Sequence, residues 1–154
     1  MKALPPDLAA HLAGGVTTLA HCWRIDRRDG LLFGFTDHDV DLTFDGVTYR
    51  ADSGFTASAL ESMPGLAVSN VELEGALRSD ALDDADLAAG LFDDATCRLY
   101  LVNWRAVEQR VLLRRGHIGE VSRNRMGYRA ELRGLSHRLE QASGRLFERR
   151  CAWT

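Results

Sequence analysis

The stretch that decides the fold is Thr36–Arg50, which reads TDHDVDLTFDGVTYR. Successive side chains of a β-strand face opposite ways, so the first part of this stretch predicts one strand with an apolar face and an acidic face. The apolar face would carry His38, Val40, Leu42 and Phe44, and the opposite face would carry Asp37, Asp39, Asp41 and Thr43. Asp45 and Gly46 then predict a two-residue hairpin turn, because both central residues of a type I′ turn need positive φ.

Patterns typical of strands continue on both sides of this stretch. Val16–Ile25 and Leu31–Phe35 indicate two strands joined by a turn at Asp26–Gly30. Gly34 indicates a bulge or a close approach of another backbone. Further strands are predicted at 68–73, 96–104, 110–122 and 128–133, and short helices at 8–13, 79–92 and 135–142. About eight short strands with a few small helices predict a mainly β fold, an antiparallel β-barrel or β-sandwich in which closure removes exposed strand edges.

Length and composition indicate the class of protein. The 154 residues are 45% hydrophobic and 27% charged, with a net charge of -3, which is typical of one soluble domain that buries about 70% of its unfolded surface. We expect a helical arm at 1–15, a β-barrel domain at 16–144 and the start of a second, cysteine-containing region at 145–154. No apolar run is long enough for a membrane span and no secretion signal is visible, so we expect synthesis in the cytoplasm without a membrane anchor.

Asp37, Asp39 and Asp41 are the first candidate site, because divalent cations prefer carboxylate oxygens. A metal-dependent hydrolase would use such a face. Same-face residues of a strand lie about 7 Å apart, however, so three carboxylates reach one ion only where other strands add ligands. A solvated strand face that discourages edge-to-edge pairing is the simpler interpretation. The sequence motifs of serine hydrolases and of phosphate-binding loops do not occur in the chain.

Arginines concentrate in the C-terminal third, among them Arg114, Arg115 and Arg129. A basic β-barrel binds single-stranded nucleic acid where aromatic side chains alternate with the arginines and stack on bases, but here only Tyr128 does so. Two glutamates lie among these arginines, so ion pairs between strands or a subunit interface are favoured. The slightly acidic net charge also argues against nucleic acid as a partner.

The three cysteines lie far apart in the sequence and show neither a disulfide framework nor a zinc motif. Cys22 and Cys97 lie in strand patterns and are predicted to be small buried apolar residues. Cys151 has no apolar periodicity around it. Because zinc and iron–sulfur sites need about four ligands, Cys151 suggests a site whose other ligands lie beyond Thr154.

Several separate blocks of the sequence resemble one protein family, in the same order along the chain. They are GFTDHD at 34–39, LTFDGVTY at 42–49, GFTAS at 54–58, VELEGAL at 71–77, ADLAAG at 85–90, VNW at 102–104, VLLRRG at 111–116 and ELRGL at 131–135. Over most of residues 16–154 they resemble the N-terminal half of tail-tip, or baseplate, hub proteins of gene transfer agents and related long-tailed phages and prophages.

The resemblance implies a structural virion protein, assembled into a particle tail, with no catalytic step. Hub proteins of this kind form a ring, typically a homotrimer, that joins the distal tail protein to the host-contacting tip protein, and their domains include small β-barrels. In this family a second half holds an iron–sulfur cluster on four cysteines, and Cys151 matches the first of them. Family members are longer than this chain, so no cofactor is expected within it.

We therefore expect the chain to act by self-association and docking. Its charge distribution suggests contact surfaces of opposite sign, formed by Arg114, Arg115 and Arg129 and by Asp37, Asp39 and Asp41. Two alternatives stay open. One is the metal-dependent hydrolase at the aspartates, and the other is a barrel that binds single-stranded nucleic acid through Tyr128 and Arg129.

Overall fold

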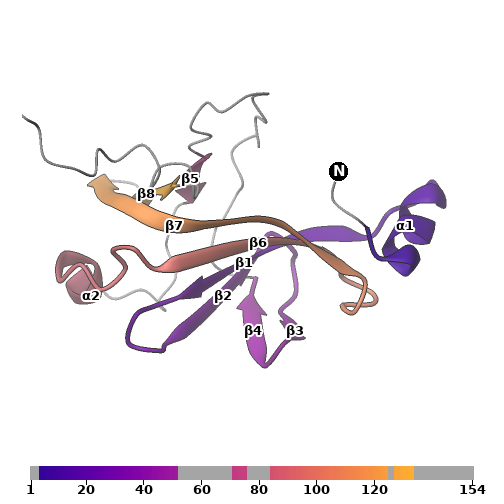
Figure 1. The fold of residues 1–154 in the computed structure, drawn as a ribbon, viewed down its shortest axis with the longest axis horizontal. Helices are drawn as coiled ribbons and strands as arrows, with labels where there is room; N and C mark the ends of the chain where they lie inside the picture. The colour runs from indigo at the N-terminus through magenta and orange to yellow at the C-terminus, as the bar shows by residue number, and fades with distance from the viewer. Residues whose placement is uncertain (1–3, 52–70, 76–83, 125–126, 134–154) are drawn as a thin grey trace, which may run out of the picture.

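The structure is a computed structural model that describes residues 4–51, 71–75, 84–124 and 127–133. Its elements are α1 (Pro6–Ala13), β1 (Leu19–Asp26), β2 (Leu32–Thr36), β3 (Leu42–Phe44), β4 (Val47–Arg50), β5 (Val71–Gly75), α2 (Asp84–Ala88), β6 (Thr96–Asn103), β7 (Arg110–Asn124) and β8 (Gly127–Arg133) (Figure 1). The described chain is mostly strand with two small helices, which confirms the predicted fold class.

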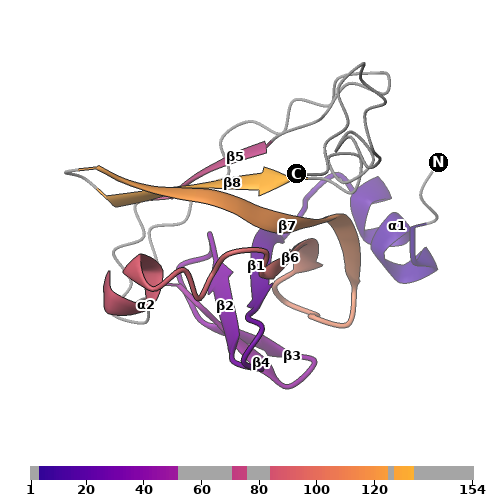
Figure 2. The same ribbon diagram turned by 60° about the vertical axis from the view of Figure 1, so that its left-hand side comes forward.

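The strands form one sheet in the order β3-β4-β2-β1-β6-β7-β8-β5. Neighbouring strands are antiparallel except β2 and β4, which are parallel, so the sheet is mixed where the sequence predicted an antiparallel one. β7 pairs with β6 through residues 110–117 and with β8 through residues 117–124. A register shift in each of these pairings bends the sheet, which curls into a half-barrel (Figure 2).

The first part of the stretch TDHDVDLTFDGVTYR folds differently from the prediction. β2 ends at Thr36, residues 37–40 form a bend and β3 begins at Leu42, so His38 does not share a strand face with Leu42. The Asp37 carboxylate holds the bend by accepting a hydrogen bond from the backbone N–H of His21 in β1. Side-chain bonds of this kind compete with strand pairing. Alternation along the sequence does not reveal the bend, because His21 lies on another strand.

The second part of the stretch folds as predicted. β3 and β4 form a hairpin around Asp45 and Gly46, whose φ angles of 49° and 71° suit a type I′ turn. The hairpin then runs against β2 at Gly34. A Cβ placed on Gly34 would lie 2.6 Å from the backbone oxygen of Thr48, closer than real carbon and oxygen atoms approach. The predicted close approach of another backbone at Gly34 is therefore confirmed, and the approaching strand is β4.

The sheet is covered by apolar clusters on both faces. Trp23 and Ile25 of β1 pack with Phe35, Phe92, Ala95, Cys97, Leu99 and Ile118. Ala20 and Cys22 pack with Leu42, Phe44, Val47, Tyr49 and Val102. Since alternate residues of β1 contribute to different clusters, the clusters lie on opposite faces. Cys22 and Cys97 are core residues, as predicted, and burial raises the pKa of Cys22 to about 11 and that of Cys97 to about 12.

The helices are small and lie at the margins of the sheet (Figure 1). α1 buries Leu8, and its His11 accepts a hydrogen bond on Nε2 from the backbone N–H of Thr18 at 3.0 Å. α2 lies inside the predicted helical range 79–92. Neither described helix is long and apolar enough to cross a membrane. The predicted helix at 135–142 and the region 145–154 lie outside the described residues, so the domain boundaries stay predictions.

Candidate assembly interface

Asp37 is bound to β1 and holds the bend after β2. Its two carboxylate oxygens lie 2.7 Å from the backbone nitrogen of His21 and 2.8 Å from Nδ1 of the His21 ring. Burial raises the pKa of Asp37, but the hydrogen bonds from His21 lower it by more, so the pKa of this carboxyl lies below its ordinary value. Asp37 therefore has a structural role, which its place in an alternating pattern did not indicate.

Asp39 and Asp41 do not form a common acidic site with Asp37. Asp41 accepts a hydrogen bond of 2.9 Å from the backbone N–H of Ala51, just after β4, and Asp39 is exposed. Within the part of the chain that the structure describes, no three histidine, cysteine or acidic side chains are placed to hold a metal ion. The predicted acidic strand face is wrong, because alternation needs a continuous strand and residues 37–40 bend. The metal-dependent hydrolase gains no geometric support from these aspartates.

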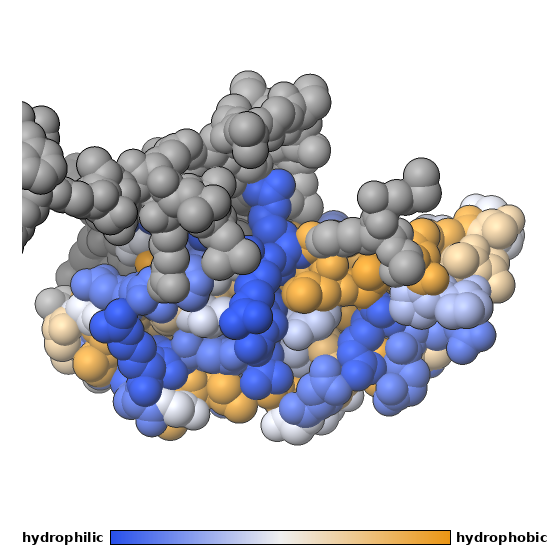
Figure 3. Space-filling model, in the orientation of Figure 1, coloured by the Kyte–Doolittle hydropathy of each residue, from blue (hydrophilic) through white to orange (hydrophobic). Residues whose placement is uncertain are grey.

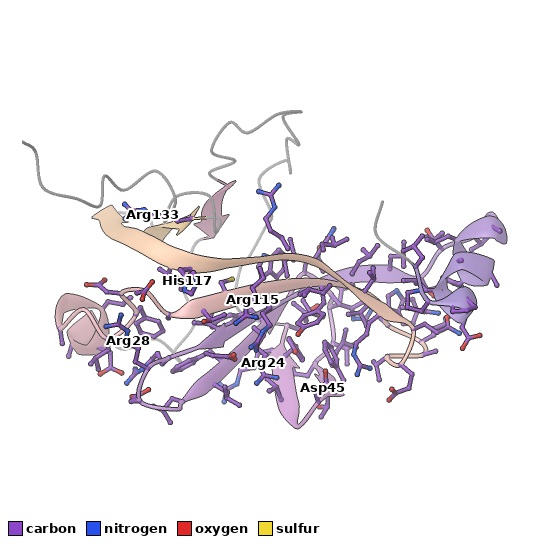
Figure 4. All side chains as sticks on the ribbon, viewed as in Figure 1. Arg24, Arg28, Asp45, Arg115, His117 and Arg133 are labelled. Carbon is purple, nitrogen blue, oxygen red and sulfur yellow. The ribbon has the colours of Figure 1, made fainter. Side chains whose placement is uncertain are left out.

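Arg115 lies at one end of a row of arginines that crosses three strands. It pairs in register with Arg98 of β6, which pairs in register with Arg24 of β1, and residues paired across strands share a face. Figure 4 shows Arg24 and Arg115 near the middle of the sheet, and Figure 3 shows hydrophilic side chains crossing the same region. Arg24, Arg98 and Arg115 are called the arginine row below.

Asp26 is the acidic residue that binds the row. Its carboxylate accepts a hydrogen bond of 2.6 Å from Nε of Arg24 and another from the guanidinium of Arg98. The hydrogen bond to Asp26 raises the pKa of Arg24 above its ordinary value, so this side chain is permanently charged. Asp26 thus binds two of the three guanidinium groups of the row. With three arginines and this one bound carboxylate, the row is a cationic strip on the sheet.

The other predicted arginines are placed differently. Arg114 is half-buried and pairs in register with Leu99, so it faces the opposite side of the sheet from Arg115. Arg129 lies in β8 and pairs in register with residues of β5 and β7, next to Tyr128. The structure therefore places Arg115 in a cluster with arginines that the sequence did not single out. The nucleic-acid alternative at Tyr128 and Arg129 stays a hypothesis.

Sequence reasoning missed a buried arginine in the turn after β1. The Arg27 side chain is 4% exposed, and its guanidinium lies over the rings of both Phe33 and Phe92, which contact each other, with its central carbon 5.7 Å and 5.1 Å from their centres. It binds the carboxylate of Asp29 in the same turn and that of Asp86 in α2, the latter at 2.5 Å. We name these five residues the Arg27 clamp. A polar turn cluster indicates an exposed loop, so only the distant partners show that Arg27 is buried.

Comparisons with known proteins identify the family. The family model described as "Baseplate hub protein, N-terminal attachment domain" matches residues 5–154. A solved chain from a structure titled "Virion of native gene transfer agent (GTA) particle" is 50% identical, with a TM-score of 0.84. The match covers 97% of this chain and 51% of that chain, so this chain spans about half of its length. No curated protein matches. The resemblance seen in the sequence is confirmed: the chain belongs to the baseplate hub proteins, as their N-terminal attachment domain, and is a structural component of a phage-type virion particle.

Proposed function

We propose that this domain attaches a baseplate hub to its neighbours in the tail and joins the distal tail protein to the host-contacting tip protein. The observation that carries the proposal is the match over 97% of the chain, at 50% identity, to a chain of a gene transfer agent virion. The matched family is itself described as an attachment domain. The domain would act by self-association and docking, without a chemical step.

The geometry of the sheet supports a role in assembly. Apolar clusters cover both faces, and the Arg27 clamp ties α2 to the turn between β1 and β2. Close-packed interiors deform little, so such a domain holds its loops and edges at constant positions. In a closed ring, each copy presents the same surface to the next copy. We propose a homotrimer of this kind, with the arginine row facing an acidic neighbour.

Removal of the protein from particle-producing cells tests this function. We expect particles whose tails lack the host-contacting tip and do not adsorb to cells, with recovery when the wild-type protein is supplied. Electron microscopy of the tails and an adsorption assay measure the two effects. Complete, adsorbing particles made without the protein would show that the proposed role is wrong.

Cross-linking within assembled particles tests the homotrimer. A bifunctional amine or carboxyl reagent should yield a ladder of covalent species that ends at the trimer, seen by mass spectrometry. The same ladder should be absent from dissociated particles. A ladder that ends at another size would show that the ring has that number of copies and that the homotrimer is wrong. Monomer alone would contradict self-association.

We further propose that Cys151 is one ligand of an iron–sulfur cluster in a longer protein. Cys22 and Cys97 belong to clusters on opposite faces of the sheet, and burial raises the pKa of both thiols, so they do not fit as ligands of a common cluster. The remaining ligands would come from residues outside this chain, which spans 51% of the matched chain. The cluster would supply a covalent link between segments that hold its ligands.

Substitution in the longer protein tests this ligand. Cys151→Ser should remove the visible absorbance and the iron content of the purified protein, whereas Cys97→Ala should leave both intact once folding is verified by circular dichroism. Unchanged iron content in Cys151→Ser would contradict the assignment.

A further inference from the structure

β2 and β4 part on one side of their short pairing and leave a cleft of about 490 Å³. The two strands pair at Gly34 and Phe35 of β2, and the cleft lies toward Leu32. Its lining includes Leu32, Phe33 and Gly34 of β2 and Val47, Thr48 and Arg50 of β4. Leu32 is 47% exposed and Leu31 beside it is 52% exposed. The cleft thus combines an open strand edge with exposed apolar side chains.

The register shows which backbone groups of β2 face this cleft. The backbone N–H of Arg27 donates to the carbonyl of Leu31, which lies opposite it. In an antiparallel pair of strands only every second pair of opposite residues is hydrogen-bonded, and Arg27 and Leu31 form one of these pairs. Leu32 belongs to the next pair, so its N–H and C=O point away from β1. The pairing with β4 begins only at Gly34. Leu32 therefore offers its backbone groups to an extended segment that enters the cleft.

The surface that continues from the cleft is cationic. Gly34 pairs in register with Arg24, so the arginine row starts one strand away from the cleft, and Arg50 lines the cleft itself. Among the described residues that line the cleft, none is acidic. The side chains of Arg24 and Arg98 are 19% and 24% exposed. A carboxylate that reaches such partly buried guanidinium groups forms a stronger bond than it would at a fully solvated surface.

The distance between neighbouring strands determines how long a bound segment must be to contact both the cleft and the arginine row. The path from Gly34 through Arg24 and Arg98 to Arg115 crosses three strand intervals, which is about 14 Å. An extended chain covers that distance in about four or five residues. A single short segment therefore reaches from the cleft to the far end of the arginine row.

We propose that the cleft and the arginine row together are the docking site for an extended acidic segment of a neighbouring tail protein. An apolar residue of the segment fills the cleft against Leu32 and bonds its backbone, and the acidic residues that follow lie along Arg24, Arg98 and Arg115. The negative charge of the occupant follows from the charge of the surface. The inference rests on the assembly role proposed above and specifies the chemistry of the partner.

Binding of a synthetic peptide tests the site directly. The probe is a fluorescent peptide in which two valines precede alternating glycine and glutamate, and its control carries lysine in place of glutamate. We expect fluorescence anisotropy to show binding of the glutamate peptide that weakens as salt rises. Leu32→Glu and Arg115→Glu should each weaken binding at least about tenfold. Arg105→Glu is the matched control, because Arg105 is exposed, stacks on Trp104 and belongs neither to the arginine row nor to the residues that line the cleft.

Several outcomes would overturn the proposal. Equal binding of the lysine peptide, tighter binding of a single-stranded oligonucleotide, or unchanged binding by both variants would each do so, provided that circular dichroism shows the variants folded. Particle assembly separates the two proposals. Leu32→Glu and Arg115→Glu should give tails without tips, as removal of the protein does. If both variants give complete particles while removal does not, the docking site is wrong and the assembly role stands.

Discussion

At the scale of single residues, Gly34 allows the parallel pairing of β2 and β4. Its missing side chain leaves room for the backbone oxygen of Thr48 and for Val47, which a Cβ would meet at 2.6 Å and 2.9 Å. The contact at Thr48 is with backbone, which has no rotamer to change. The strand arrangement at this edge therefore depends on one glycine.

Gly34→Ala should lower the free energy of unfolding by about 1 to 3 kcal/mol, the usual cost of overpacking. Urea denaturation measures the effect. Gly119→Ala is the matched control, because a Cβ there would meet the flexible end of Arg133, which is able to move aside. A Gly34→Ala protein as stable as the Gly119→Ala protein would contradict the close approach of β4.

Asp37 makes the stability of the bend depend on pH. Its pKa is lowered in the folded protein, against an ordinary value of about 3.9. A lowered folded pKa contributes stability in full above the unfolded pKa, and this stability is lost as pH falls through the folded pKa. The hydrogen bond from Arg27 lowers the pKa of Asp29, which acts in the same direction.

The free energy of unfolding should therefore be nearly level from pH 7 to about pH 5 and fall at lower pH. Asp37→Asn should make that fall shallower, since the substituted side chain does not titrate. Asp39→Asn, in the same bend but exposed, should keep the wild-type slope. Urea titrations at several pH values measure the slopes, and equal slopes in wild type and Asp37→Asn would refute the role given to this carboxylate.

At the scale of elements, the Arg27 clamp explains how a helix of one turn stays in place. α2 has five residues, far fewer than an isolated helix needs for stability in water. Asp86 of α2 is bound by Arg27, whose guanidinium also covers Phe33 of β2 and Phe92. The tertiary contact with Arg27 therefore provides the stability that so short a helix lacks on its own.

Arg27→Met should lower the melting temperature and speed amide exchange at Ala89 and Leu91, whose N–H groups donate to carbonyls of α2. Methionine keeps the apolar contact with the rings but leaves Asp86 without its cation. Arg28→Met is the control, because Arg28 is 71% exposed and binds Asp94 at the surface, where ion pairs contribute little. Calorimetry and hydrogen exchange measure the two effects. Equal behaviour of the two variants would show that the clamp does not stabilise α2.

At the scale of the whole molecule, the two apolar clusters make unfolding and thiol exposure the same event. Cys22 and Cys97 are buried on opposite faces of the sheet, and burial raises the pKa of each thiol, so little thiolate exists at neutral pH. Thiolate is the form that reacts with disulfide reagents.

In a Cys151→Ser background, Ellman's reagent should label neither thiol in the native protein at neutral pH and both in denaturant. The labelling rate at increasing urea should follow the loss of the far-ultraviolet circular dichroism of the sheet. Rapid labelling of one thiol under native conditions would show that the cluster on its face opens independently of the other.

The sequence by itself determined the features that neighbouring residues decide. The type I′ turn at Asp45 and Gly46 follows from backbone conformations that these residue types allow, and burial of Cys22 and Cys97 follows from the strand patterns around them. The order of short blocks along the chain indicated the baseplate hub family. The turn and the burial of the thiols use information contained within a few consecutive residues, and the family uses only the order of short blocks, so none of these inferences needs the contacts between strands.

The tertiary structure alone decided the features that depend on distant partners. The bend at 37–40 forms because the Asp37 carboxylate accepts a hydrogen bond from the backbone of His21. Arg27 is buried because it binds the carboxylate of Asp86, which lies 59 residues away in the sequence. The parallel pairing at Gly34 and the arginine row depend on the register between strands. Alternation specifies which faces a strand has, but the balance between hydrogen bonds, burial and charge at each face is settled only when the strands pair.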